Sequence, residues 1–391
     1  MARFSLAALL MAGAATASKL LYVSSYAGTI TTLNMTDTTP SGGNAPAMKA
    51  ISTNQGCSPS PSWLTLDYKN AALYCVDEGL STPGGSLSSF RTNCDGSLKN
   101  LGKITTAGGP VSAVIYGAKG HGLAMAHYGG STFSTYDITN PAQIQSVESI
   151  KFTDPPGPHP QQNAPHPHQA VLDPTGKFIL IPDLGADVIR IYSFDPNSLK
   201  VTALPSVKAK AGSGPRHIAF AVKDGKTFAY LITELGNTIV GYEVTYGDSI
   251  QLKEIFTIGV HGEGKPVPDN AAASEVVVSP DNNYLIASSR RENIYKVPDF
   301  DNKNQQIDSD SLINFEIDGA TGKLTVIQDV AAGGRFPRQF SINKAGTRVA
   351  VGMQSDARVV VLERDPATGR LGDFVSYANV AGQITSVIFN E

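Results

Sequence analysis

The feature that most constrains the fold is a repeated pair of short apolar strands joined by a tight polar turn. The clearest copy is His168–Asp187, with the sequence HQAVLDPTGKFILIPDLGAD. Self-similarity at a near-fixed interval is the signature of repeat architectures, in which one structural unit is built several times. Similar copies occur at Arg216–Asn237, Ser274–Asn293 and Arg338–Asp356, and weaker ones at Ser62–Gly79 and Val111–Gly129.

Each copy predicts a unit of four antiparallel strands. A third apolar stretch follows the pair, as at Val188–Phe194 and Arg358–Arg364, and a second turn such as DPNSLKV or DPATGRL leads to a fourth. Asp, Asn, Pro and Gly supply the backbone angles that hairpin turns need. The 38 Gly, 24 Pro and only 17% charged residues agree with many short strands rather than long helices. Four antiparallel strands per repeat predict the blade of a β-propeller.

The spacing of the copies predicts seven blades. The first strands begin 47 to 64 residues apart, near the interval of about 50 residues in kelch-type blades, at Ser62, Val111, His168, Arg216, Ser274, Arg338 and Thr385. The last copy keeps one strand, Gln383–Phe389, and Leu20–Ser24 and Thr29–Leu33 resemble its missing strands. We therefore expect an all-β, seven-bladed propeller whose chain ends pair and leave no exposed edge there.

The N-terminus predicts secretion. Arg3 precedes the apolar run Phe4–Ala15, and Ala15-Thr16-Ala17 matches a cleavage site, so residues 1–17 are expected to be a signal peptide. A buried first strand is the alternative. Residues 18–391 form a single predicted domain, without another stretch of ~18 apolar residues that could span a membrane. The net charge of -3 and the lack of a basic stripe argue against a nucleic-acid partner.

Two further features bear on an extracellular location. Asn34-Met35-Thr36 is a sequon for N-glycosylation at Asn34. Of Cys57, Cys75 and Cys94, a secreted chain could pair two and leave one over. The sequence does not select the pair, and three buried thiols are an equal alternative.

The blade geometry gathers polar residues at one mouth of the ring. The start of the first strand and the end of the second lie at the same mouth, and the first strand lies nearest the axis. We therefore expect one cluster of candidate site residues there, namely His168, Arg216, Arg338, Glu275, Asp183, Glu234, Arg290 and Gln354, with His127 in the same register of a weaker copy.

The chemistry of this cluster suggests binding of an anion. Packing alone would favour apolar or small residues around a narrow axis. A surplus of guanidinium groups instead suits a small anionic substrate, because arginine binds carboxylates through a planar fork. The alternative is a structural role, in which these charged side chains hold neighbouring blades together. A metal held by His166 and His168 with Asp183 or Glu234 is a further alternative, although no cofactor motif is present.

Three segments are expected to be loops or inserts. His159–His168, HPQQNAPHPH, is rich in proline and must be a loop. Leu252–Ala273 and Val297–Leu312 are expected to be long inserts between strands. Long loops on a rigid scaffold often bind ligands.

The mature chain resembles the lactonase-type seven-bladed propellers, which include bacterial 6-phosphogluconolactonases and the fungal carboxy-cis,cis-muconate cyclase. The likeness is most specific in PHPHQAVLDPTGKFILIPDLGAD, GPRHIAF, TELGNT, SSRREN and GGRFPRQFSIN. The resemblance implies a catalytic set of one His, one Glu and two Arg, which by motif are His168, Glu234, Arg216 and Arg290 here. LIASSRREN is closer to the cyclase and GGRFPRQF to the gluconolactonase branch, while a secretory start departs from both.

The resulting hypothesis is a secreted enzyme that opens or closes a lactone ring on a carboxylate-bearing small molecule. Arg216 and Arg290 would bind carboxylates or developing negative charge, and His168 and Glu234 would be the acid and base. Arg338, Glu275, Asp183, Gln354 and His127 are candidates for substrate binding. No cofactor is needed for either reaction. The alternatives are a non-catalytic secreted propeller that binds a small ligand or a protein partner, and a Ca²⁺-dependent lactonase.

Overall fold

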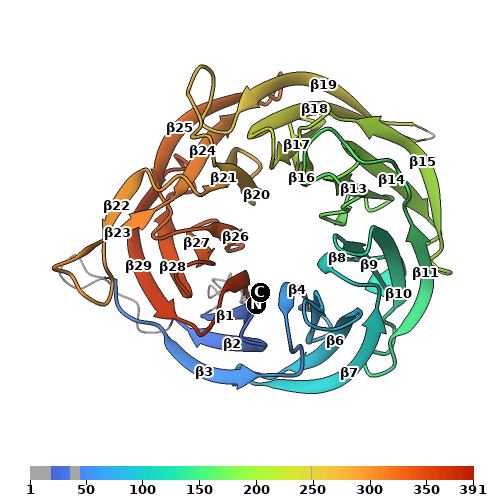
Figure 1. Ribbon diagram of the computed structural model, residues 1–391, viewed down its shortest axis with the longest axis horizontal. Helices are drawn as coiled ribbons and strands as arrows, with labels where there is room; N and C mark the ends of the chain where they lie inside the picture. The colour runs from blue at the N-terminus through green and yellow to red at the C-terminus, as the bar shows by residue number, and fades with distance from the viewer. Residues whose placement is uncertain (1–18, 36–44, 248) are drawn as a thin grey trace, which may run out of the picture.

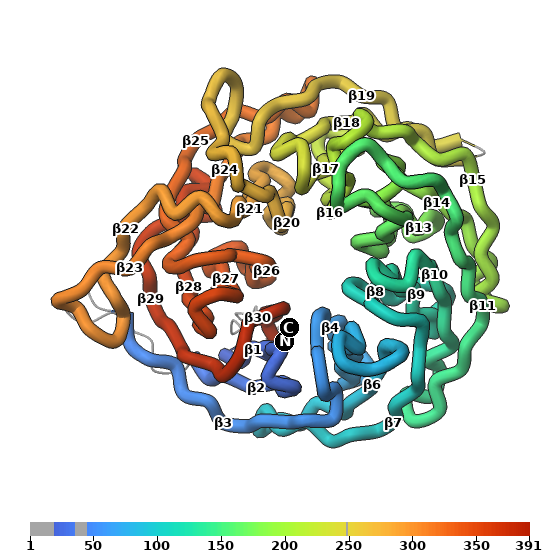
Figure 2. Tube along the Cα trace, viewed as in Figure 1, coloured from blue at the N-terminus to red at the C-terminus, as the bar shows by residue number. Residues whose placement is uncertain are grey.

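The computed structural model describes residues 19–35, 45–247 and 249–391, so the predicted signal peptide lies outside the described residues. Within these ranges the chain forms seven four-stranded antiparallel sheets, arranged as blades around a central axis (Figure 1). The Cα trace shows the chain passing once around the ring, with both ends close together near the axis (Figure 2). The predicted seven-bladed propeller is confirmed.

The blades are numbered here by the chain order of their first, innermost strand. Blade 1 comprises β4 (Pro61–Asp67), β5 (Ala72–Asp77), β6 (Gly85–Thr92) and β7 (Leu98–Thr106); blade 2 comprises β8 (Pro110–Tyr116), β9 (Gly122–His127), β10 (Thr132–Asp137) and β11 (Gln145–Lys151), with a 3-10 turn, η1, at Ala118–Gly120; blade 3 comprises β12 (Val171–Leu172), β13 (Phe178–Asp183), β14 (Val188–Phe194) and β15 (Val201–Lys208).

The remaining blades follow the same plan. Blade 4 comprises β16 (Pro215–Lys223), β17 (Lys226–Thr233), β18 (Thr238–Tyr246) and β19 (Ile250–Gly259); blade 5 comprises β20 (Ala272–Val278), β21 (Tyr284–Arg290), β24 (Ser311–Ile317) and β25 (Leu324–Ala331), with the hairpin β22 (Tyr295–Pro298) and β23 (Gln306–Ser309); blade 6 comprises β26 (Pro337–Ile342), β27 (Arg348–Met353), β28 (Arg358–Arg364) and β29 (Leu371–Asn379); blade 7 comprises β30 (Ile384–Phe389), β1 (Leu20–Ser25), β2 (Thr29–Asn34) and β3 (Lys49–Asn54).

The apolar core lies between the blades. In the described part of the chain it consists of seven clusters, each shared by two neighbouring blades. For example, Phe133 of blade 2 packs against Tyr192 of blade 3, with ring centroids 4.8 Å apart. Inner strands such as β13 are therefore buried on both faces, whereas outer strands such as β15 alternate between covered and exposed residues. Each large apolar side chain buried this way contributes about 1.5–3 kcal/mol.

The ring closes through its chain ends, as predicted. Strand β30 pairs with β1, with Val387 opposite Val23, and the Ser24 and Thr385 hydroxyls are hydrogen-bonded over 2.8 Å. The N-terminal segment also supplies β3, which the sequence pattern did not predict. Closure leaves blade 7 with the same four-stranded order as the others.

The expected inserts are shorter or more ordered than predicted. Residues 252–259 belong to the regular strand β19, so the irregular loop spans only 260–271. The second insert is the hairpin β22–β23 rather than a loop, and Arg358 of blade 6 donates to Asp301 at its tip over 2.7 Å. The proline-rich stretch His159–His168 is a loop, as expected, with an isolated bridge from Pro167 to Asp183.

The structure also decides the cysteine question. Cys57, in the connection before β4, and Cys75 of β5 form a disulfide, and Cys94 is an exposed thiol. The alternative of three buried thiols is therefore wrong. Asn34 ends β2 and is half-buried, while Thr36 of its sequon lies outside the described residues. None of the helical segments described has the length and apolar character that a membrane crossing requires.

Candidate active site

A β-bulge aims the first residues of the inner strands at the axis. In blade 4, Pro215 pairs with Thr233 and His217 with Ile232, so Arg216 is an extra residue in the ladder. A bulge of this kind bends the strand and redirects its side chains. The inner strands of blades 1, 2, 6 and 7 have the same extra residue at Ser62, Val111, Arg338 and Thr385.

These bulged residues converge, as the sequence analysis predicted. Six of the seven predicted first-strand starts line one axial cavity of about 10 Å³, namely Ser62, Val111, His168, Arg216, Arg338 and Thr385. The seventh, Ser274, contributes its carbonyl, which accepts a hydrogen bond from Arg216 Nη1 over 2.7 Å. Trp63, His217 and Gln339 complete the lining. Residues spread over most of the chain therefore meet at one point because the repeat places them in equivalent positions.

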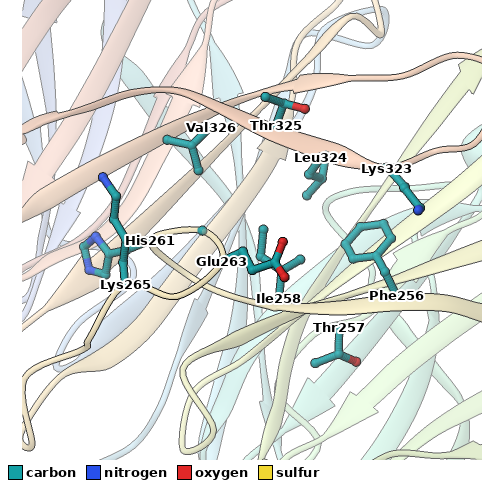
Figure 3. A pocket seen from close by; sticks show the side chains of 11 residues that line it. Phe256, Thr257, Ile258, His261, Glu263, Lys265, Lys323, Leu324, Thr325 and Val326 are labelled. Atoms are coloured by element: carbon teal, nitrogen blue, oxygen red, sulfur yellow. The ribbon is translucent and has the colours of Figure 1, made fainter.

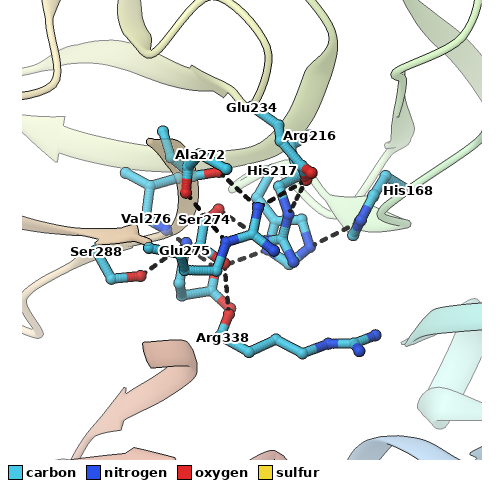
Figure 4. A network of polar contacts seen from close by, with 12 residues as sticks. His168, Arg216, His217, Glu234, Ala272, Ser274, Glu275, Val276, Ser288 and Arg338 are labelled. Atoms are coloured by element: carbon cyan, nitrogen blue, oxygen red, sulfur yellow. Dashed lines mark hydrogen bonds and ion pairs between the residues drawn. The ribbon is translucent and has the colours of Figure 1, made fainter. Parts of the chain in front are cut away.

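A buried Arg–Glu–Arg trio lies at this point. Arg216 reaches Oε2 of Glu234 over 2.9 Å (Figure 4). Arg290 reaches the same oxygen over 2.9 Å and also donates to the carbonyls of Ala272 and Ala273. Burial would raise the pKa of Glu234, but the two guanidinium groups outweigh it and hold the pKa below its usual value. Burial, together with the charge of Arg290, lowers the pKa of Arg216 to about 9. Glu234 is therefore an anion at neutral pH.

Two histidines lie beside the trio. His168 Nδ1 is 3.2 Å from His217 Nε2, and His217 Nδ1 is 2.7 Å from Oε1 of Glu275. Burial, reinforced by the nearby charge of Arg216, lowers the pKa of His168 well below its usual value. Burial also lowers the pKa of His217, although Glu275 opposes the shift. Both imidazoles are therefore neutral at pH 7 and can act as proton acceptors.

Arg338 belongs to a second polar group on the same cavity. Its guanidinium donates to the Tyr26 hydroxyl over 2.8 Å and to Glu78 over 3.0 Å. In Figure 4 it points away from Glu234 and Arg216. Burial opposes the charge of Arg338, but Tyr26 and Glu78 more than compensate and raise its pKa. Arg338 is thus a permanent cation.

Three candidates from the sequence are not part of these groups. Asp183 Oδ1 accepts the backbone N–H of His166 over 2.7 Å, and its Oδ2 accepts from Arg190 over 2.9 Å. His127 contacts the Ala107 carbonyl and the Ser134 hydroxyl inside blade 2, and Gln354 donates to Gln383. The structure therefore shows Asp183 holding the turn after β13 and His127 linking β9 to β10 and to the chain before β8.

Asp183 and His127 lie outside the site because successive side chains along a strand point to opposite sides. Asp183 and His127 are the last residues of β13 and β9 and point into the blade. Glu234 is one residue past the end of β17, where the side chain turns to the mouth. A shift of one residue therefore separates a site residue from a structural one.

The same register reveals residues that the sequence analysis missed. Glu78, Tyr128 and Glu234 occupy equivalent positions, each one residue past the end of the second strand of its blade. In each of these blades a proline of the first strand pairs with the last residue of the second strand, namely Pro61, Pro110 and Pro215. These prolines, repeated at Pro167 and Pro337, were an available signal, since proline in sheets is confined to strand starts, edges and bulges. His217 was inside the quoted motif GPRHIAF but was not assigned.

The added residues change the charge of the site. Glu78 joins the predicted Glu234 and Glu275, so the cluster holds three carboxylates and three arginines. Glu234 pairs with Arg216 and Arg290, Glu78 pairs with Arg338, and Glu275 contacts His217. The surplus of positive charge expected from the sequence is therefore not present among the described side chains of this cluster. Arg216 and Arg290 nevertheless keep donors for a substrate: in the described part of the chain, Arg216 Nη2 and Arg290 Nη1 have no hydrogen-bond partner.

No metal-binding arrangement is seen within residues 19–35, 45–247 and 249–391. His166, a candidate ligand, instead contacts the Tyr128 carbonyl and Asn163. A larger cavity of about 500 Å³ lies between the outer strands of blades 4 and 5, lined by Phe256 and Ile258 on one side and Leu324 and Val326 on the other (Figure 3). It contains none of the axial side chains.

Known proteins resemble this chain over almost its whole length. Residues 20–389 match the family model "Lactonase, 7-bladed beta-propeller". A protein of Arthroderma benhamiae named "Probable 6-phosphogluconolactonase" is 32% identical over 325 residues, which are 82% of this chain and 78% of that protein. The 6-phosphogluconolactonase of Bacillus subtilis is 24% identical over 314 residues, 80% of this chain and 82% of its own.

Solved structures show the same fold. A candidate 6-phosphogluconolactonase of Bacteroides fragilis superposes with a TM-score of 0.79 at 27% identity, covering 96% of this chain and 99% of that one. The periplasmic gluconolactonase of Pseudomonas aeruginosa shares the fold, with a TM-score of 0.76 at 22% identity over 95% of this chain and 98% of its own. The chain belongs to the lactonase family of seven-bladed β-propellers.

Proposed function

We propose that this protein is a secreted lactonase that hydrolyses the ring ester of a small lactone at the axial mouth. The observation that supports this most is that His168 and Arg216, from blades 3 and 4, line the same cavity. A neutral imidazole next to a guanidinium places a base beside an electrostatic stabiliser, the two elements that ester hydrolysis needs. The names of the relatives in the lactonase family support the same reaction.

The proposed mechanism uses only side chains of this chain. His168 accepts a proton from water, and the water oxygen attacks the lactone carbonyl. Negative charge then develops on the carbonyl oxygen, where Arg216 Nη2 and Arg290 Nη1 are available to donate. The ring C–O bond breaks, the leaving alkoxide takes the proton from His168, and the product is a hydroxy acid. Glu234 holds both guanidinium groups in place.

The charge of the cluster bears on the substrate. The charges of the three arginines are balanced by those of Glu78, Glu234 and Glu275. The cluster therefore has no excess positive charge that would favour a phosphate group. We propose an uncharged or singly charged sugar-type lactone. This choice is consistent with the proposed secretion, because the Cys57–Cys75 disulfide indicates an oxidising compartment. Glycosylation at Asn34 belongs to the same proposal.

Ring closure on a muconate-type acid is a second candidate. It is favoured by the way in which Arg216 and Arg290 already bind one carboxylate oxygen from two sides. A substrate carboxylate held by the remaining donors could add to its own alkene, while the neighbouring carbon takes a proton that His168 Nε2 has first accepted from solvent. The motif that resembles the cyclase, LIASSRREN, contains Arg290.

The test is turnover by the purified mature protein, residues 18–391. Glucono-δ-lactone, 6-phosphogluconolactone and 3-carboxy-cis,cis-muconate are each assayed above the spontaneous rate, with and without EDTA. Hydrolysis of the sugar lactone, unaffected by EDTA, is the expected result. Muconate turnover would favour ring closure, and loss of activity with EDTA would favour a Ca²⁺-dependent enzyme. No turnover of any compound, with ligand-induced thermal stabilisation, would identify a binding protein and refute the proposal.

A further inference from the structure

Three side chains from three consecutive blades form a continuous line behind the proposed base. Glu275 in β20 contacts His217 in β16 over 2.7 Å, and His217 contacts His168, just before β12, over 3.2 Å. All three are buried, with Glu275 only 3% exposed. The line is visible in Figure 4 as two successive dashed bonds ending at His168.

The bonding pattern fixes where the protons lie. An ionised carboxylate can only accept, so His217 Nδ1 must donate its proton to Glu275. A neutral His217 then has a lone pair on Nε2, which can only accept, and His168 Nδ1 must be the donor. Nε2 of His168 is left with its lone pair. In the described part of the chain this nitrogen has no hydrogen-bond partner, and the ring lines the axial cavity.

Glu275 is a costly residue for packing alone. Burying a carboxylate is unfavourable unless partners compensate for its lost hydration. Oε1 accepts from His217 and from the backbone N–H of Val276, but Oε2 is buried without a hydrogen-bond partner among the described residues. An apolar side chain would satisfy this position better if blade packing were its only role. The sequence-based assignment of Glu275 to substrate binding also does not fit, since Glu275 is on the far side of His217 from His168.

Aromatic rings hold the line in place from the sides. Trp63 packs edge-on against His217 with centroids 5.7 Å apart, and Tyr128 packs edge-on against His168 with centroids 5.6 Å apart. Both histidine rings are therefore restricted in rotation by packing as well as by hydrogen bonds. A ring that cannot turn presents the same nitrogen to a substrate in every turnover.

We infer that His217 and Glu275 are positioning residues that hold His168 in the tautomer whose Nε2 is the proton acceptor, and that stabilise the imidazolium formed when it takes the proton from water. This inference rests on the proposed function of His168 as the base. The proton stays on His168 Nε2 until the leaving alkoxide takes it, and His217 and Glu275 keep their own protonation states throughout. The negative charge of Glu275, relayed through the His217 hydrogen bond, favours the transient cation.

The kinetic test compares Glu275→Gln with a matched control. Asp329→Asn removes the carboxylate from another histidine–carboxylate pair, His261–Asp329, which has the same 2.7 Å separation and is partly buried. His261 lines the cavity between the outer strands of blades 4 and 5, away from the axis. Glu275→Gln should lower kcat about 10- to 100-fold with little change in KM, as loss of a supporting hydrogen bond does in other sites. Asp329→Asn should leave both constants within about twofold, which would exclude a general effect of losing the carboxylate partner of a histidine.

The pH profile gives a readout that simple destabilisation would not move. The titratable groups that surround His168 are His217, Arg216, Arg290, Arg338 and Tyr128, and Glu275 is the carboxylate of the line. Without this anion the imidazolium is less favoured, so the acid limb of kcat should move to lower pH in Glu275→Gln. An unchanged kcat and an unchanged acid limb in this variant would overturn the inference.

A spectroscopic measurement separates this inference from the proposed function. Long-range ¹H–¹⁵N NMR spectra of the wild-type protein identify the protonated nitrogen of each imidazole, whether or not a substrate is turned over. The proton of His168 is expected on Nδ1, and a proton on Nε2 would refute the positioning role. If His168→Gln is inactive while Glu275→Gln is fully active, the positioning role fails and the proposed function stands. If His168→Gln remains active, the proposed function fails.

Discussion

Arg216 and Arg290, from neighbouring blades, donate to the same oxygen of one buried carboxylate, Oε2 of Glu234, each over 2.9 Å. Two cations and one anion thus share a site from which water is largely excluded, and Glu234 holds both arginines. Removing Glu234 would leave two buried cations without their counter-charge, which is more costly than the loss of a surface ion pair. The trio is therefore both a candidate catalytic element and a structural link between blades 4 and 5.

Arg290→Ala tests both roles. We expect kcat/KM to fall about 100-fold, because a donor to the developing negative charge is lost. The carbonyls of Ala272 and Ala273 lose their donor as well, so the free energy of unfolding should fall by about 1–3 kcal/mol. Steady-state kinetics and denaturant unfolding measure the two effects. Full activity in a folded Arg290→Ala protein would remove Arg290 from the mechanism.

The pH dependence of kcat/KM follows from two shifted pKa values. His168 must be neutral to act as a base, and burial and Arg216 lower its pKa well below 6.5, so the acid limb should lie below pH 6.5. Arg216 must be charged, and its pKa of about 9 predicts a second decline near pH 9. Activity should therefore be nearly constant between these limbs. A loss of activity centred near pH 6.5 would indicate an ordinary, solvated histidine instead.

The disulfide should affect stability and not catalysis. Cys57 and Cys75 are 18 residues apart, and closing a loop of this size stabilises a protein by about 3 kcal/mol. The double variant Cys57→Ala/Cys75→Ala should therefore unfold at lower denaturant concentration and retain its kcat. Cys94→Ala is the control and should change neither, because this thiol is exposed and unpaired. A large loss of kcat in the folded double variant would contradict the separation of the disulfide from the chemistry.

The propeller could be predicted from the sequence because each blade repeats the same local signals. Val188–Phe194 and Arg358–Arg364 were predicted as third strands with the bounds that β14 and β28 have. The closure of the ring was also predictable, since an unpaired strand at each end can be satisfied only by the other. Strand β3 was missed because its residues Lys49–Asn54 are mostly exposed on an outer edge and show no apolar pattern.

The site was only partly predictable. The first-strand starts were placed correctly, because they are aligned by the repeat itself. At the ends of the second strands Glu234 and Arg290 were placed correctly and Asp183 was not, because a one-residue difference decides whether a side chain faces the mouth, as Glu234 does, or the blade, as Asp183 does. The partnership of His217 with Glu275 depends on side-chain rotamers across two blades, which no pattern along the chain encodes.

The central claim is that residues from separate blades form one catalytic site with His168 as its base. The most direct test is kcat/KM of His168→Gln on the lactone that the wild-type protein hydrolyses fastest. His121→Gln is the control, since His121 follows η1 in the turn between β8 and β9, at the opposite mouth. We predict a loss of 10²- to 10⁴-fold for His168→Gln, as for removal of a general base, and unchanged activity for His121→Gln. Wild-type activity in a folded His168→Gln protein would contradict the account.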